Sequence, residues 1–222
     1  MRASEKTYRT LRDEILEGKL LPGTVLAEVE QSSRLRVSRT PIRQALSRLV
    51  ADGLVAAQSP RMLVVTDMDT ERVRSLYELR YALESHAAAL AARRRDTAPF
   101  ERIQRELIAA PELLVDSEDG LRRYFSIVDA LDEAIDEAAE NSYLSAALAS
   151  VRLHSARIRR LSRHDADRLR NAAKEHLLVV EAILESDPEL AAHATHIHLR
   201  NSLTSALARL ETHTAVSSSQ RT

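Results

Sequence analysis

Side chains suited to contact a polyanion gather near residue 40. Ser38, Arg39, Thr40 and Arg43 supply hydroxyl and guanidinium donors within one short segment. Guanidinium groups pair with phosphates and with guanine edges, and hydroxyls donate to phosphate oxygens. Apolar residues recur in this segment at helical spacing, at Ile42, Ala45, Leu46 and Leu49. The segment therefore predicts an amphipathic helix whose polar face contacts DNA, with a solvated basic helix face as the alternative.

Local signals place the start of this helix at residue 38. Ser38 is a residue type that caps a helix, and Pro41 fits the first turn, where a missing N–H costs little. The amino end of a helix offers free N–H groups and a partial positive charge to an anion. The sequence therefore predicts a DNA-recognition helix over residues 38–50.

Composition limits the class of protein. Only four glycines and six prolines occur in 222 residues, which favours helices over sheet. The chain contains no cysteine, which excludes disulfides and thiolate metal sites. We find no apolar run of membrane-spanning length and no signal-peptide core, so we expect a soluble, cytoplasmic protein with no membrane partner.

The charge is distributed unevenly along the chain. The net charge is −1, yet residues 1–66 hold 11 Lys and Arg against 7 Asp and Glu, by direct count. The remaining residues hold 21 basic against 26 acidic side chains. A basic head on an acidic body is typical of a DNA-binding domain carried on a second domain.

Turn and breaker residues divide the chain into expected elements. Helices are expected at 5–18 and 28–35, and wing strands at 54–57 and 62–65, with a tip at 58–61. Further helices are expected at roughly 70–94, 98–109, 118–139, 142–162, 165–185 and 188–211. Pro111 marks one break, and the Ser/Thr-rich residues after 212 show no apolar pattern.

Three neighbouring motifs resemble the winged helix-turn-helix of the GntR family of bacterial transcription regulators. They are residues 20–26 (LLPGTVL), 37–46 (VSRTPIRQAL) and 52–55 (DGLV). The resemblance implies a winged helix-turn-helix over residues 1–66, in which Ser38, Arg39, Thr40 and Arg43 contact DNA. It also assigns Arg61, in the wing tip, to a backbone or minor-groove contact, with a solvated loop arginine as the alternative.

The head departs from the family pattern at three positions. Gln31 stands where a buried leucine is usual, and Arg36 stands where the turn glycine is usual. Arg36 is therefore expected either to carry a small strain or to contact a phosphate. Val29 occupies a position that often holds a DNA-contacting arginine, so that contact is not expected in this chain.

The rest of the chain resembles the FCD domain, a helical effector-binding bundle found in one GntR subfamily. Residues 76–84 (LYELRYALE), Glu175-His176 and His198 carry this resemblance. It implies a mainly α protein, with a winged helix-turn-helix followed by an all-α FCD-type bundle. The expected domains are the head at 1–66, a linker at 67–70, a helical effector-binding and dimerisation domain at 71–212, and a disordered tail at 213–222.

Many FCD domains bind a metal through an Asp, a His four residues later, and two histidines on later helices. In this chain His176 and His198 match the late histidines, and Asp132 stands at the position of the first His. Val128 replaces the Asp, although the nearby Asp129 could partly replace its carboxylate. The resemblance therefore implies a divalent metal, zinc or similar, held by Asp132, His176 and His198. The alternative is that the histidines bond an organic ligand directly.

Arg80 is a candidate anchor for a carboxylate effector, because a guanidinium in a cavity pairs bidentately with carboxylates. A salt bridge with Glu84 or another acid is an equal alternative.

The features together indicate a DNA-binding transcription regulator, with no enzyme activity. The expected mode is a homodimeric repressor on an inverted-repeat operator in double-stranded DNA, released by a small organic acid bound in the helical domain. Alternatives are a ligand-dependent activator, a hydrolase using the three metal ligands, and a helical interaction module without a ligand. The sequence shows no nucleophile elbow, phosphate-cradling loop or clear general base, which disfavours the hydrolase.

Overall fold

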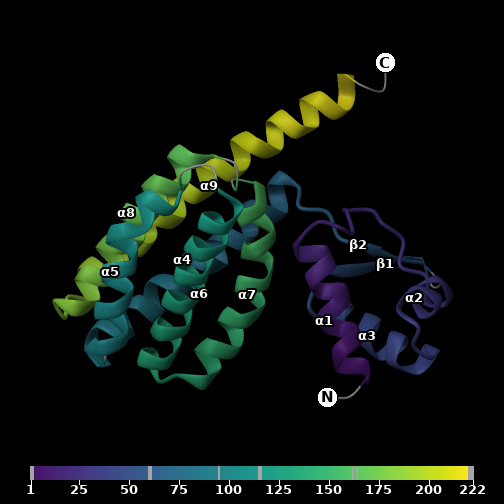
Figure 1. Ribbon diagram of the computed structural model, residues 1–222, viewed down its shortest axis with the longest axis horizontal. Coiled ribbons are helices and arrows are strands. Elements are labelled where there is room, and N and C mark those ends of the chain that lie inside the picture. Colours follow the sequence, from purple (N-terminus) through teal and green to yellow (C-terminus); the bar gives the residue numbers. More distant parts are fainter. Residues whose placement is uncertain are drawn as a thin grey trace. The chain divides into compact units, whose positions relative to one another are not determined.

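The computed structural model describes residues 3–59, 62–94, 96–114, 117–161, 163 and 165–219, without the side chains of 161 and 213–219 (Figure 1). The chain divides into two compact units between Asp69 and Thr70, and residues Leu153–Arg157 group with the first unit. Residues 66–69, which join the units, have no regular secondary structure. Each unit is described by itself below.

The first unit is a winged helix-turn-helix. It contains α1 (Ala3–Leu16), α2 (Glu28–Leu35), α3 (Arg39–Ala51), β1 (Val55–Ser59) and β2 (Met62–Val65). The two strands pair antiparallel, with Val55 opposite Val65, and Val25 forms a further bridge to Val64. Gly23 allows this bridge, because its φ of +80° lets the chain turn after Pro22 at little steric cost. The small sheet therefore closes over the same core as the three helices.

The core of this unit is the apolar stripe expected from the sequence. Ile42, Ala45, Leu46 and Leu49 of α3 are each at most 1% exposed, and they pack with Leu11 and Ile15 of α1. Burying the leucine and isoleucine side chains contributes about 1.5–3 kcal/mol each to folding, before entropy costs. The opposite face of α3 is consequently left to the polar residues.

Two turn positions behave differently from ordinary helix ends. Ser38 is the N-cap of α3, as expected, with extended backbone at φ −66° and ψ 165°, but its hydroxyl accepts no capping hydrogen bond from the described residues. Arg36 ends α2 in the left-handed conformation, at φ 53° and ψ 43°. The strain expected at Arg36 is therefore present, because a non-glycine residue pays a steric cost in this region.

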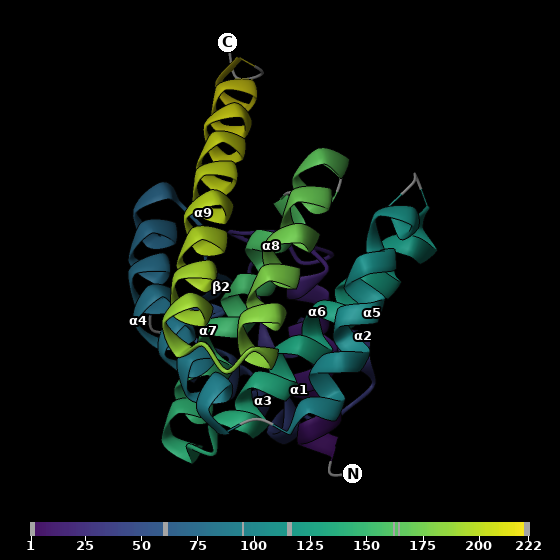
Figure 2. The same ribbon diagram turned by 90° about the vertical axis from the view of Figure 1, so that its left-hand side faces the viewer.

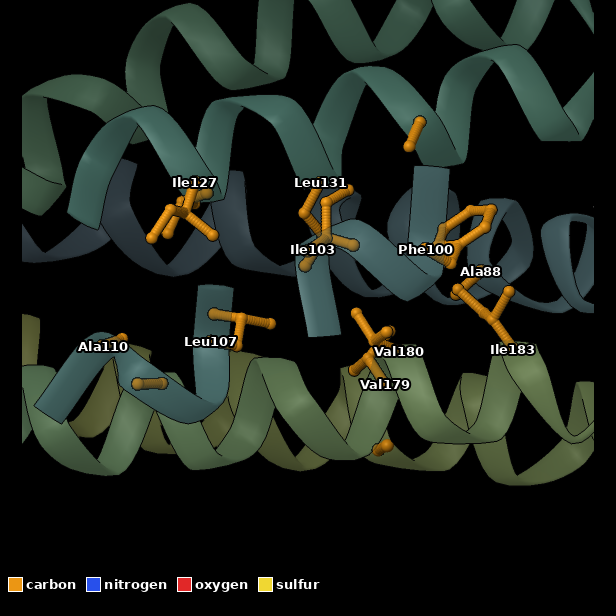
Figure 3. Packing of buried hydrophobic residues seen from close by; sticks show 14 of the residues in the cluster. Ala88, Phe100, Ile103, Leu107, Ala110, Ile127, Leu131, Val179, Val180 and Ile183 are labelled. Carbon is orange, nitrogen blue, oxygen red and sulfur yellow. The ribbon is translucent and has the colours of Figure 1, made fainter. Parts of the chain in front are cut away.

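In the residues that the structure describes, the second unit is a bundle of six long helices. They are α4 (Thr70–Arg94), α5 (Thr97–Leu113), α6 (Glu118–Ala139), α7 (Ser142–Leu161), α8 (Ala166–Leu184) and α9 (Pro188–Ser219). α4 runs along α9, and α8 packs on both α9 and α5 (Figure 2). The centre is filled by side chains such as Phe100, Ile103, Leu131, Val180 and Ile183 (Figure 3). The mainly α fold class expected from the sequence is confirmed.

The largest differences from the expected helix bounds are at the carboxyl ends of α5 and α9. α5 passes through Pro111 to Leu113, because a proline removes only its own N–H and the helix ends soon afterwards. α9 remains helical to Ser219, where the sequence suggested a disordered tail from 213. Residues 212–219 contain neither glycine nor proline, so no helix-breaking residue ends α9 in this segment.

In the part of the chain that the structure describes, no helix combines the length and apolarity needed to cross a bilayer.

Candidate functional site

The amino-terminal half of α3 presents its polar side chains together. Ser38, Arg39, Thr40 and Arg43 are all exposed, and the side chain of Arg43 is 71% exposed. The structure therefore brings these four predicted DNA-contacting residues onto one accessible surface, as helical spacing requires. Arg61, the fifth, lies outside the described residues.

Arg43 is held by a carboxylate that sequence reasoning missed. Its Nε donates to Oε1 of Glu28 and its Nη2 donates to Oε2, both at 3.0 Å. Glu28 is the first residue of α2, and its hydrogen bonds with Arg43 lower the pKa of the Glu28 carboxyl. No local pattern signals this pair, because the two residues lie on different helices.

A second set of contacts fastens α3 to α1. The Arg48 guanidinium lies 3.8 Å from the centroid of the Tyr8 ring and donates to Glu5 at 2.7 Å. The Tyr8 hydroxyl donates to Asp52 at 2.6 Å, just beyond the end of α3. These contacts, together with the buried stripe, set the position of the recognition helix within its unit.

In the helical unit, His176 and His198 are brought together as the sequence suggested. Their ring centroids are 4.3 Å apart. The His198 Nδ1 lies 2.8 Å from Oε2 of Glu175, and the His176 Nδ1 lies 3.3 Å from the Tyr124 hydroxyl. Burial lowers the pKa of both histidines, that of His176 well below its usual value. Both imidazoles are therefore neutral near pH 7, which suits coordination or hydrogen bonding.

Glu175 connects this histidine pair to a wider polar cluster. It accepts two hydrogen bonds from Arg168, at 3.2 and 3.0 Å, and one from Asn201 at 2.8 Å. Because an ionised carboxylate only accepts, His198 donates from Nδ1 and keeps the lone pair on Nε2. Sequence reasoning identified the histidines and missed Tyr124, Arg168 and Asn201, which have no fixed spacing from them.

Asp132, the third predicted metal ligand, faces arginines. Its carboxylate lies 3.6 Å from Nε of Arg152 and 3.9 Å from Nη1 of Arg159. Burial raises the pKa of Asp132 to about 6, against the opposing effect of Arg152. The neighbouring Asp129 also pairs with Arg159, at 3.3 Å. The predicted substitute carboxylates are thus already neutralised by cations.

The predicted metal set therefore fits only in part. The two neutral imidazoles suit a divalent ion, but among the described residues no group of three His, Cys, Asp or Glu side chains is arranged to hold one. Asp132 therefore does not form a three-ligand group with His176 and His198.

Arg80 is buried at 8% exposure and paired within its own helix. Its Nε and Nη2 donate to Glu84 at 2.7 and 3.1 Å, and its guanidinium lies 4.6 Å from the Tyr77 ring centroid. Of the two interpretations left open by the sequence, the salt bridge is the one that the structure contains. A carboxylate ligand on Arg80 would have to displace Glu84.

A winged helix with an exposed basic recognition helix, followed by a helical bundle, defines a DNA-binding transcription regulator. Residues 3–65 match the family described as "Bacterial regulatory proteins, gntR family", and residues 75–201 match the FCD domain. The chain therefore belongs to the FCD-containing branch of the GntR family.

Relatives agree over most of the chain. It is 30% identical over 188 residues, 84% of this chain and 80% of the relative, to a probable D-xylose utilization operon transcriptional repressor of Paenarthrobacter nicotinovorans. It is 29% identical over 90% of its length to the regulator BphR of Paraburkholderia xenovorans, covering 83% of that protein. The fold resembles the solved structure of Escherichia coli McbR/YncC, with a TM-score of 0.73, 19% identity, and 94% and 99% of the two chains covered. The first two relatives are named as transcription regulators, and the matched family is one of regulators rather than enzymes, which removes the hydrolase alternative.

Proposed function

We propose that this regulator represses transcription by binding an operator as a homodimer, and that a small organic acid bound in the helical domain releases it. The exposed amino half of α3, with its four donors on one surface, is the observation that carries the operator contact. The names of two relatives, the D-xylose operon repressor and the repressor RspR of Escherichia coli, support the repressor mode.

The operator is proposed to be an inverted repeat. One winged helix covers only a few base pairs, so a specific site requires two copies of the head, and two-fold protein symmetry matches a palindromic sequence. The helical domain supplies the dimer contact in this proposal.

The effector is proposed to be a carboxylate. Arg80, Arg152 and Arg168 are largely buried cations whose partners are carboxylates of the same domain, Glu84, Asp136 and Glu175. An incoming organic acid would exchange with one of these, and Arg80–Glu84 is the candidate pair. The neighbouring neutral histidines would hydrogen-bond the rest of the ligand.

A reporter fused to the promoter upstream of the gene tests repression directly. Deletion of the gene is expected to raise reporter output, and lowered output would favour the activator alternative. Small dicarboxylic and sugar acids are then screened for release of the purified protein from that promoter DNA.

Glu84→Gln and Asp119→Asn make a matched pair of variants for the effector site. Glu84→Gln frees Arg80 and is expected to strengthen the response to an acid, whereas Asp119→Asn removes the partner of the exposed Arg122 and is expected to change nothing. An equal response in both variants would remove Arg80 from the effector site.

A further inference from the structure

The contact between Glu28 and Arg43 uses only one edge of the guanidinium. Arginine has five N–H donors in a planar fork. Glu28 accepts from Nε and from one N–H of Nη2, which together form the lateral edge of the guanidinium. The other N–H of Nη2 and the adjacent N–H of Nη1 form the outer edge of the guanidinium and are not used by Glu28.

That outer edge has the geometry that reads guanine. Two parallel N–H groups of an arginine pair with O6 and N7 of guanine in the major groove. A carboxylate clamped on the inner edge holds the plane and direction of the guanidinium before DNA arrives. The rotamer entropy that a long exposed side chain loses on binding is then already partly lost in the free protein.

Glu28 is itself held in place by its helix. It lies in the first turn of α2, where the helix dipole favours a carboxylate. The same helix is anchored by Gln31, which is 2% exposed, and by Arg34, whose two Nη atoms donate to Glu14 of α1 at 2.7 and 2.6 Å. These anchors fix the rotation of α2, so that Glu28 faces α3.

We propose that Glu28 is a positioning residue that directs Arg43 onto one guanine of each operator half-site without touching DNA itself. This rests on the proposed base contact of Arg43. Glu28 then contributes sequence discrimination rather than general affinity, because its negative charge opposes phosphates while its geometry aids base reading.

The test is selection of bound DNA from a random-sequence duplex library by the full-length protein, followed by sequencing. The compared proteins are wild type, Arg43→Ala, Glu28→Gln and Glu17→Gln. Glu17→Gln is the matched control, because Glu17 forms an exposed ion pair with Lys19 in the same unit and neither residue lies on the recognition helix. Each variant removes one charged group of an exposed ion pair.

Arg43→Ala is expected to abolish the preference for guanine at one position of each half-site. Glu28→Gln is expected to weaken that same preference about fivefold, the scale of a well-formed exposed ion pair, and to leave other positions unchanged. Glu17→Gln is expected to select the same sequences as wild type. The salt dependence of binding should be alike in wild type and Glu28→Gln, because both proteins contact the same number of phosphates.

The outcomes separate the two claims. If Arg43→Ala keeps every preference, the base contact itself is wrong. If Arg43→Ala loses one position and Glu28→Gln keeps it at wild-type strength, the contact stands and the positioning role is overturned. A loss spread over all positions in Glu28→Gln would likewise overturn it, because that pattern indicates a general effect on the head.

Discussion

At the scale of single residues, the two exposed arginines in the amino-terminal half of α3 differ in what holds them. Arg43 has a fixed direction set by Glu28, and Arg39 is exposed at the first position of the helix. A side chain with a fixed direction suits base reading, and one at the helix amino end suits phosphate binding.

The first prediction concerns these two arginines. Arg43→Ala is expected to weaken binding to the promoter upstream of the gene by about 10- to 100-fold per half-site, with little change on unrelated DNA. Arg39→Ala is expected either to do the same or to weaken all sequences alike. Fluorescence anisotropy with both DNAs measures this, with Arg122→Ala in the helical domain as the control. Unchanged promoter affinity in both variants would remove the recognition role from α3.

The second prediction concerns zinc at the histidine pair. Because two imidazoles are adjacent while Asp132 is paired with arginines, we expect at most weak, substoichiometric zinc. The double variant His176→Ala/His198→Ala should lose that zinc and the effector response but keep DNA binding. Elemental analysis of protein purified without chelator or affinity tag is the measurement. Tight zinc at one ion per chain would contradict the arrangement of these side chains.

At the scale of elements, the ends of the helices carry local costs and gains that can be measured. Arg36 closes α2 with a left-handed backbone, and Asp165 caps the start of α8 with its carboxylate. Both positions lie outside the buried cores, so their effects are expected to be modest and local.

Replacing Arg36 with glycine is expected to stabilise the head. Glycine adopts φ 53° without the steric cost that arginine pays, so the free energy of unfolding should rise by about 1 kcal/mol. Arg36→Ala keeps a Cβ and should bring no such gain. Urea unfolding of the three proteins gives the values, and equal stability of the glycine and alanine variants would show that strain is not the cause.

Removing the Asp165 cap is expected to destabilise α8 in a pH-dependent way. Its Oδ1 accepts from the backbone N–H of Arg168 at 3.0 Å, and Oδ2 accepts from Arg209 at 2.6 Å. Asp165→Ala should lower the free energy of unfolding by about 1 kcal/mol at pH 7.

The sign of the pH effect follows from the direction of the shift. The hydrogen bonds from Arg168 and Arg209 lower the pKa of Asp165 below that of the unfolded chain. Its charge therefore stabilises the fold above about pH 4, and this contribution is lost as the pH falls through the folded pKa. Unfolding at pH 7 and pH 3 should show the deficit of Asp165→Ala shrinking in acid. Asp165→Asn, which retains a cap acceptor, should lose less at pH 7.

At the scale of the whole molecule, DNA and effector are proposed to bind different units joined through residues 66–69. Binding to one unit changes affinity at the other only if the ligand prefers one arrangement of the dimer over another. Because the proposed regulator is a homodimer, its mass in solution should be about twice the 24.8 kDa of one chain.

The last prediction is reciprocal coupling. An acid that weakens promoter binding by some factor must itself bind more weakly, by the same factor, to the protein–DNA complex. Titration of the acid with and without promoter DNA measures both factors, while circular dichroism checks that both units stay folded. Tighter DNA binding with the acid would instead indicate a co-repressor or an activator.

The amino-acid sequence alone determined the elements of this protein. α2, α4 and α6 begin and end where periodicity and breaker residues placed them, and the buried face of α3 is the one predicted. Local patterns suffice here because a helix end and a helix face depend on neighbours along the chain. The largest exceptions are at Pro111 and after residue 212, where α5 and α9 continue, and α1 begins and ends two residues earlier than expected.

Only the tertiary structure decided which side chains meet. It paired Arg43 with Glu28, joined His198 to Glu175, and set Asp132 against arginines. Periodicity places a residue on a face of its own helix. It does not give the rotation and height of that helix against its neighbour, and a shift of one turn, about 5.4 Å, exchanges every partner across the contact. Packing of the two cores sets those values, and with them the chemistry of the sites.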